Sequence, residues 1–211
     1  MRTYPCPSCG ASVTFHADTS LLAICEYCRS TLLRRDVDVE QLGKMAELLH
    51  DGSVLQLGVE GVYDGVHFAV VGRIQLKYPD GLWNEWYLVF DDMRTGWLGE
   101  ARGHYAVSFE TDVPDAIPDF EAISAGQTIE LDGNQYEVSD VQSAKCIAGE
   151  GELPFEVGAG YEAPVGDLSG DGNTFASIDY SEETPRVFIG EYMEFADLRF
   201  SGLKEIQGWK R

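Results

Sequence analysis

The sequence predicts a mainly β protein with an N-terminal four-cysteine zinc ribbon, one linker helix and two related small β-barrel or sandwich-like units. Three observations lead to this prediction: paired cysteines near the N-terminus, short apolar segments separated by turn residues, and a motif that occurs twice. The expected segments are a zinc ribbon at 1–35, a linker helix at 36–51, a first β unit at 52–110, an acidic linker at 111–125 and a second β unit at 126–211.

Four of the five cysteines form two Cys-x-x-Cys pairs, Cys6 with Cys9 and Cys25 with Cys28, and 15 residues separate the pairs. This spacing is typical of four-cysteine zinc sites, in which two tight turns complete a tetrahedron of thiolates. Gly10 suits the first turn because glycine tolerates positive φ. We expect a structural zinc ion, with iron as the alternative. Because protein sulfurs would fill all four positions, we expect no catalysis at this metal.

The linker helix is predicted from apolar residues at intervals of three and four, namely Val39, Leu42, Met45 and Leu49. Such a stripe would pack the ribbon against the domain that follows. Beyond Gly52 the pattern changes to short strands joined by glycine-rich turns, which favours a small barrel or sandwich.

A cluster of aromatic residues lies within the first β unit, namely Trp83, Trp86, Tyr87 and Trp97. We expect Trp86 to lie in the core. Trp83 lies beside a predicted turn, and Trp97 begins the next short strand. Small barrels often bind peptides through exposed aromatic grooves, so we expect Trp83 and Trp97 to line a partner surface.

The motif D-G-x-x-aromatic-x-V occurs at Asp64–Val70 and again at Asp132–Val138. Upstream of these, Gly52–Leu57 matches Gly126–Leu131 as G-x-x-aliphatic-x-L. Asp-Gly is a common hairpin turn, so chance similarity is one explanation. We prefer an internal duplication, in which each copy places a strand, a glycine turn and a second strand in the same order.

With these motifs in place, the chain resembles the bacterial domain-of-unknown-function family 4178. The resemblance depends on the CPSCG…CEYC ribbon, on Asp132–Val138, on the stretch Gly149–Pro154 and on Gly190-Glu191-Tyr192. It implies this architecture and a bacterial cytoplasmic setting. It implies no activity, substrate or site residue.

The chain has 211 residues with 36 acidic and 15 basic side chains, a formal charge of −21. Residues 1–35 hold four arginines and two acidic residues, so the rest carries −23. An anionic surface repels phosphate backbones, so nucleic acid is an unlikely partner, although Arg29, Arg34 and Arg35 leave a nucleic-acid-binding ribbon as an alternative. We find no apolar run near the roughly 20 residues of a membrane helix and no signal-peptide pattern, and therefore expect a cytoplasmic protein without membrane insertion.

No nucleophile elbow, phosphate-binding loop or histidine metal motif occurs in the sequence. Glu150 and Glu152 are weak catalytic candidates, because an extended strand would place both on one face. Asp167–Asn173 resembles the start of a calcium loop but has Ile178 where a bidentate glutamate is expected. Cys146 is interpreted as a buried small apolar residue, with a reactive thiol as the alternative.

The sequence therefore favours a non-catalytic zinc-ribbon adaptor whose acidic β surface contacts a protein or a cationic ligand. A carboxylate-dependent, hydrolase-like enzyme that uses the second β unit is the alternative.

Overall fold

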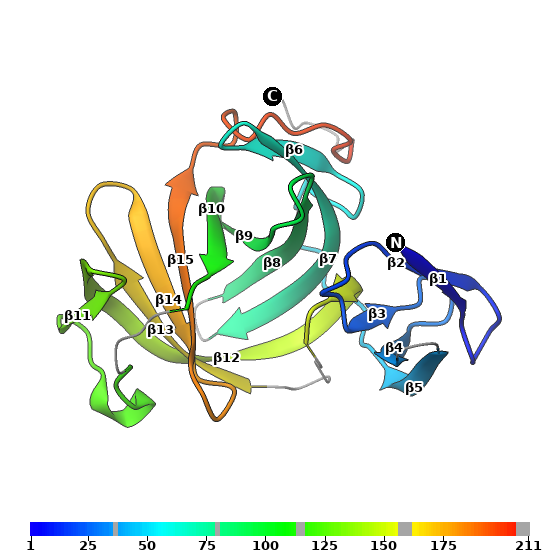
Figure 1. Ribbon diagram of the computed structural model, residues 1–211, viewed down its shortest axis with the longest axis horizontal. Coiled ribbons are helices and arrows are strands. Elements are labelled where there is room, and N and C mark those ends of the chain that lie inside the picture. Colours follow the sequence, from blue (N-terminus) through cyan, green and yellow to red (C-terminus); the bar gives the residue numbers. More distant parts are fainter. Residues whose placement is uncertain (36–37, 79–80, 113–116, 156–161, 206–211) are drawn as a thin grey trace.

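A computed structural model describes residues 1–35, 38–78, 81–112, 117–155 and 162–205. Within these ranges the chain is almost entirely β structure, with one 3₁₀ turn, η1 (Phe120–Ala122), in the predicted acidic linker. Figure 1 shows two parts side by side, a large barrel and a smaller N-terminal lobe. Among the helices of the described residues, none is long and apolar enough to cross a membrane.

The N-terminal lobe contains five short strands. The first two form a separate hairpin, and the other three run in the order β5-β4-β3 and join the barrel through β3. Their bounds are β1 (Arg2–Pro5), β2 (Ser12–Phe15), β3 (Leu22–Ile24), β4 (Ser30–Arg35) and β5 (Asp38–Lys44).

The barrel contains eight antiparallel strands in the closed order β7-β8-β9-β10-β15-β14-β13-β12, and β12 pairs back with β7. Two short strands, β6 and β11, pair with the starts of β7 and β12. The bounds are β6 (Glu60–Tyr63), β7 (Val66–Tyr78), β8 (Gly81–Phe90), β9 (Thr95–Ala101), β10 (His104–Glu110), β11 (Thr128–Leu131), β12 (Asn134–Leu153), β13 (Glu162–Ser169), β14 (Thr174–Asp179) and β15 (Arg186–Met193).

The two predicted β units are halves of this one barrel and do not form two separate barrels. Each half has a short strand, an Asp-Gly turn, a long strand and three further strands. In both turns the aspartate and the glycine have positive φ, at 48° and 77° for Asp64 and Gly65 and at 49° and 73° for Asp132 and Gly133, which suits a two-residue hairpin. The upstream match was wrong in detail, because Gly52–Leu57 forms no strand and β6 takes the place expected for it.

The linker helix predicted over 36–51 was also wrong. Asp38–Lys44 forms β5, which pairs with β4 from Arg35↔Asp38 to Ser30↔Lys44, and residues 45–51 form no regular element. Within β5 only Val39 is buried. Pairing with a neighbouring strand therefore overrides the helical spacing of the apolar residues.

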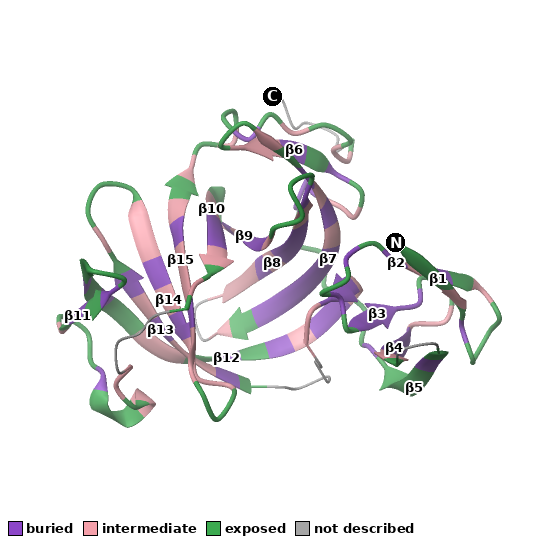
Figure 2. Ribbon diagram, viewed as in Figure 1, coloured by how far each residue is buried: buried purple, intermediate pink, exposed green. Residues whose placement is uncertain are grey.

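Side chains alternate between the two faces of the barrel wall, as Figure 2 shows by its bands of buried and half-buried residues. On β8, the even-numbered residues Trp86, Leu88 and Phe90 point outward into a core cluster with Leu55 and Leu198, which come from segments outside the barrel. The odd-numbered Trp83 and Tyr87 belong to a different cluster. Trp86, Leu88 and Phe90 thus share an outer wall that other parts of the chain cover, and Trp86 lies in a core cluster as expected.

Candidate metal site and barrel chamber

The four paired cysteines lie close enough together to hold one metal ion. Their sulfur atoms are all within 4.8 Å of one another, with 3.6 Å between Cys6 and Cys28 and 3.7 Å between Cys9 and Cys25. Four sulfurs that each lie about 2.3 Å from a zinc ion are about 3.8 Å apart, so the cluster fits a tetrahedral thiolate site. No cluster with a comparable set of histidine, cysteine or acidic ligands occurs elsewhere in the described ranges.

The two cysteine turns have the same backbone geometry. In each turn the residue after the second cysteine donates its N–H to the carbonyl of the first, at 2.8 Å for Gly10 to Cys6 and 2.9 Å for Arg29 to Cys25. Both residues have positive φ, 78° for Gly10, as expected, and 60° for Arg29. The hydroxyl of Ser30 lies 3.2 Å from Cys28 Sγ, and this contact lowers the pKa of the Cys28 thiol to about 6, which favours the thiolate that a metal requires.

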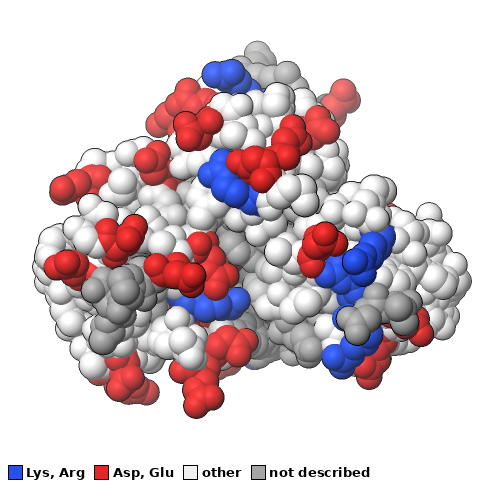
Figure 3. Space-filling model, in the orientation of Figure 1, with Lys and Arg blue, Asp and Glu red and all other residues white. Residues whose placement is uncertain are grey.

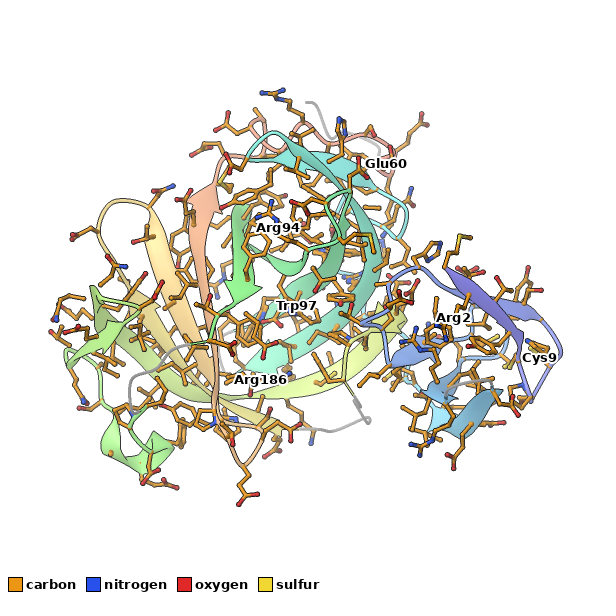
Figure 4. All side chains as sticks on the ribbon, in the orientation of Figure 1. Arg2, Cys9, Glu60, Arg94, Trp97 and Arg186 are labelled. Atoms are coloured by element: carbon orange, nitrogen blue, oxygen red, sulfur yellow. The ribbon has the colours of Figure 1, made fainter. Side chains whose placement is uncertain are left out.

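The N-terminal lobe, which contains the segment expected to be a ribbon, is attached to the barrel wall through the end of β12. Strand β3 pairs with β12 at Ile24↔Gly151 and Leu22↔Leu153, and Cys25 follows β3 directly. The carboxylate of Glu152 accepts hydrogen bonds from the backbone N–H of His16 at 2.8 and 2.9 Å and contacts the His16 ring. Figure 4 shows Cys9 at the end of the ribbon that is farthest from the barrel, so any metal would lie away from the barrel interior.

Glu150 and Glu152 do not form the paired carboxylates that the sequence suggested. Gly151 between them has a φ of 70°, which interrupts the alternation of the strand. Glu152 is buried against the ribbon, whereas Glu150 lies 3.7 Å from the guanidinium of Arg73. Neither residue lines the barrel interior.

The barrel encloses a chamber of about 460 Å³, lined by residues from all eight barrel strands. Eight-stranded barrels are either filled by their own side chains or hold one small ligand. Small residues keep this interior open. A Cβ atom built on Gly99 would meet nothing nearer than the carbonyl oxygen of Ala106 at 3.8 Å. Ala106, Ala144 and Ala163 also line the chamber.

Besides Glu100 on β9 and Asp140 on β12, four charged side chains line this chamber: Glu85 on β8, Asp167 on β13, Asp179 on β14 and Arg186 on β15. We call them the chamber cluster. Arg186 pairs with Asp179 at 2.7 Å, and its guanidinium lies 5.2 Å from the centre of the Phe155 ring. Among the described residues, no ion pair joins Glu85 or Asp167 to a lysine or arginine.

Burial shifts the acidities of these two carboxyl groups. Burial raises the pKa of Glu85 to about 7, and the charges of Asp179 and Asp167 raise it further, whereas the hydrogen bond that the Trp83 indole donates at 3.1 Å and the charge of Arg186 oppose this shift. Burial likewise raises the pKa of Asp167, against the hydrogen bond that Ser177 donates at 3.1 Å. Both shifts show that these carboxylates are poorly compensated in the folded protein.

Trp83 and Trp97 line the chamber and do not form the exposed groove that was expected. They follow the inward side of the strand alternation, since Trp83 is opposite Leu76 and Trp97 is opposite Tyr87, all in one buried cluster. Figure 4 shows Trp97 and Arg186 within the ring of barrel strands. The ring of Phe155 lies 5.7 Å from that of Trp97.

A second buried polar group lies on the outer wall, and we call Asp51, Arg73, Asn84 and Glu100 the outer cluster. Arg73 contacts Asp51 and donates to Asn84 Oδ1 at 2.6 and 3.0 Å. Glu100 accepts hydrogen bonds from Ser53 at 2.7 and 2.9 Å, from Asn84 at 3.0 Å and from the Trp86 indole at 3.0 Å. Every charge in this cluster thus has close partners of its own.

Two further candidates from the sequence were a reactive thiol at Cys146 and a calcium loop at Asp167–Asn173. Cys146 is buried in the chamber wall, and burial raises the pKa of its thiol to about 11, which disfavours a reactive thiolate. Asp167 faces the chamber while Asp171 is exposed in the turn that follows β13, so the two do not assemble a calcium site.

The ribbon arginines are engaged within the chain. Arg29 donates to the carbonyl of Gly149 at 2.7 Å, Arg34 donates to that of Ala17 at 3.1 Å, and Arg35 pairs with Glu40 at 3.1 Å. On the face drawn in Figure 3, acidic side chains are scattered over the barrel and the largest group of basic side chains lies on the ribbon.

Sequence reasoning missed Glu85, Asp179 and Arg186, and it considered Asp167 only as a calcium ligand. A signal for Glu85 was present, because it alternates with Trp83 and Tyr87 and so shares their face. An acidic residue on an aromatic strand face is a mark of a polar interior, but only the closed barrel identifies which face is the interior.

Comparison with known proteins gives a family and nothing closer. No curated protein and no solved structure matches the chain. The model of the family described as domain of unknown function DUF4178 matches residues 56–195, which include all eight barrel strands and leave out the N-terminal lobe. The chain belongs to the DUF4178 family.

Proposed function

We propose that this protein is a non-catalytic binding protein in which a zinc-loaded four-cysteine ribbon is a scaffold and the barrel chamber holds a small ligand. The observation that carries the proposal is the hollow interior of about 460 Å³, which has the size of small-molecule sites in other proteins. Its wall combines apolar and aromatic residues with a few charged groups, which is the usual composition of such sites.

The scaffold role of zinc follows from the donor set. Cys6, Cys9, Cys25 and Cys28 would fill every coordination position, so the ion would cross-link two turns and offer no place to a substrate. The lobe is small and buries few side chains of its own, and segments of this size usually need a metal or disulfides to fold.

Elemental analysis tests the zinc proposal. We expect one zinc ion per chain, and we expect Cys9→Ser to lose it, because the variant lacks one of the four sulfur ligands. Cys9 is exposed, so its replacement leaves the core intact. Cys146→Ser is the matched control, since Cys146 lies in the chamber wall, and it should retain the ion. Iron in place of zinc, or equal metal content in the two variants, would contradict the proposal.

A neutral fluorescent dye tests the chamber. N-phenyl-1-naphthylamine should bind and become fluorescent, and Gly99→Leu should abolish binding by filling the open space beside Ala106. Thr128→Leu adds the same side chain to an exposed position on β11 and should bind the dye like the unmodified protein. Equal binding by both variants would show that the dye does not occupy the chamber.

A carboxylate-dependent enzyme is the second candidate, and the raised pKa of Glu85, about 7, favours it. A carboxyl group that titrates near neutrality can donate and accept protons, and such groups concentrate in active sites. Recovery of a bound ligand by mass spectrometry distinguishes the two functions. A ligand recovered unchanged supports the binding protein, and its conversion, lost in Glu85→Gln, supports the enzyme.

A further inference from the structure

We propose that the chamber binds an organic ammonium ion, a small amine whose charged nitrogen lies among Glu85, Asp167 and Asp179 and whose hydrocarbon part contacts Trp83 and Trp97. This inference rests on the proposed ligand-binding function and names the chemical class of the ligand.

The charge of the chamber favours a cation. Arg186 is paired with Asp179, and although its charge partly offsets that of Glu85, no lysine or arginine of the described residues forms an ion pair with Glu85 or Asp167. The barrel wall opposite them supplies no lysine, since Arg186 is the only lysine or arginine among the lining residues. A buried carboxylate without a partner is costly, and a bound cation would remove that cost.

The spacing of the carboxylates favours an organic cation over a metal ion. A hard metal ion needs several oxygens within about 2.0–2.6 Å of one point. No three chamber carboxylates meet that requirement, because the cysteine cluster is the one group of three or more possible ligands within reach of a single ion in the described residues. Glu85, Asp167 and Asp179 lie on three different strands, so a cation with some length is better matched to them.

The aromatic wall supports the same conclusion. The faces of aromatic rings attract cations, most strongly for tryptophan. The chamber already shows this chemistry, since the Arg186 guanidinium lies 5.2 Å from the centre of the Phe155 ring and 5.9 Å from that of Phe188. Trp83 and Trp97 offer further rings on β8 and β9, and the indole of Trp83 donates a hydrogen bond to Glu85.

The position of the opening fits a small ligand that enters from solvent. Exposed side chains lie among the lining residues near one end, including His104, Ser139, Asp140 and Tyr192. Asp140 is the cross-strand neighbour of Asp167, so the exposed carboxylate of Asp140 lies next to the carboxylate of Asp167, which faces the chamber. An entering cation would therefore meet negative charge along its path.

Displacement of N-phenyl-1-naphthylamine compares amines with alcohols of the same shape. The pairs are benzylammonium with benzyl alcohol, and hexylammonium with hexanol. We expect at least one ammonium ion to displace the dye at about a tenfold lower concentration than its alcohol, the difference typical of a charge-assisted contact with a desolvated carboxylate.

Substitutions then locate the contact. Asp167→Asn and Glu85→Gln should each remove most of the ammonium preference, measured in each variant as the ratio of the displacing concentrations of an amine and its alcohol. Glu137→Gln is the matched control, because Glu137 is an exposed acidic residue of β12 and is not among the residues that line the chamber. It should keep the full preference if the chamber carboxylates, and not the overall negative charge, select the cation.

The outcomes separate this inference from the proposed function. If the dye binds in the chamber but no ammonium ion is preferred over its alcohol, the inference is overturned and the binding function stands. If Glu137→Gln weakens the preference as much as Asp167→Asn, surface charge explains it and the inference is also overturned. If the dye does not bind or Gly99→Leu has no effect, the proposed function itself fails.

Discussion

The two buried polar clusters of the barrel wall differ in how fully their charges are compensated. Adjacent residues of one strand belong to the two sides, since Asn84 points outward and Glu85 points inward. In the outer cluster, the single residue Glu100 accepts hydrogen bonds from three side chains, those of Ser53, Asn84 and Trp86. In the chamber cluster, Glu85 accepts one from Trp83 and faces open space.

The difference separates a structural role from a binding role. Saturated buried charges hold parts of a fold together, and the outer cluster ties Asp51, which precedes the barrel, to β7 and β8. Unsaturated charges beside a cavity lower the stability of the fold, so their presence favours a role in binding. Substitutions on the two sides should therefore change stability in opposite directions.

The largest effect is expected on the outer side. Arg73→Met should lower the free energy of unfolding by about 3–5 kcal/mol, because it leaves the buried amide of Asn84 and the carboxylate of Asp51, whose side chain is 17% exposed, without the buried cation that they contact. Chemical denaturation measures this loss. Arg35→Met is the control, since its pair with Glu40 is solvent-exposed and is worth less than about 1 kcal/mol. Similar losses of unfolding free energy in Arg73→Met and Arg35→Met would contradict the structural role of the outer cluster.

The next effect is a gain in stability on the inner side. Glu85→Gln should raise the free energy of unfolding by about 1–3 kcal/mol at pH 8, since a pKa of about 7 in the folded chain lies well above the ordinary 4.5. The amide can still accept the hydrogen bond from Trp83. Denaturation of both proteins across a pH series measures the difference.

The pH dependence of this gain has a definite sign. Near pH 4.5 the folded protein keeps its Glu85 proton while the unfolded chain begins to lose it, so the penalty on the unmodified protein starts there and grows up to about pH 7. The variant lacks this penalty. The stability difference should therefore be small near pH 4.5 and constant above about pH 7.5. A difference that does not change with pH would show that Glu85 is not the titrating group.

The smallest effect is expected for Asp167→Asn. It should also stabilise the protein at pH 8, because burial raises the pKa of Asp167, but less than Glu85→Gln, because two side chains, Ser177 and Gln142, donate to the charged form of Asp167 and one, Trp83, donates to Glu85. Glu137→Gln, on the exposed side of β12, should change the stability by less than about 0.5 kcal/mol. If Asp167→Asn instead destabilises the protein, Asp167 has a structural role like that of the outer cluster.

Local patterns determined much of the molecule directly from the sequence. The cysteine spacing predicted four sulfurs within reach of one ion, and the Asp-Gly pairs predicted hairpin turns at Asp64 and Asp132. The short apolar segments beyond Gly52 predicted strands joined by turns, and β7 to β10 are such strands. Each of these features depends on residues close together in the chain, so a short stretch of sequence is sufficient to specify it.

Only the tertiary structure decided how these pieces combine. The barrel closes through β7 with β12 and β10 with β15, pairings between residues far apart in sequence, and closure makes one face of every strand an interior. That closure turns Trp83 and Trp97 inward and brings Glu85, Asp167 and Asp179 around one cavity. It was also pairing with β4 that made Asp38–Lys44 a strand. Long-range pairing is set by the balance of all contacts, which no local pattern contains.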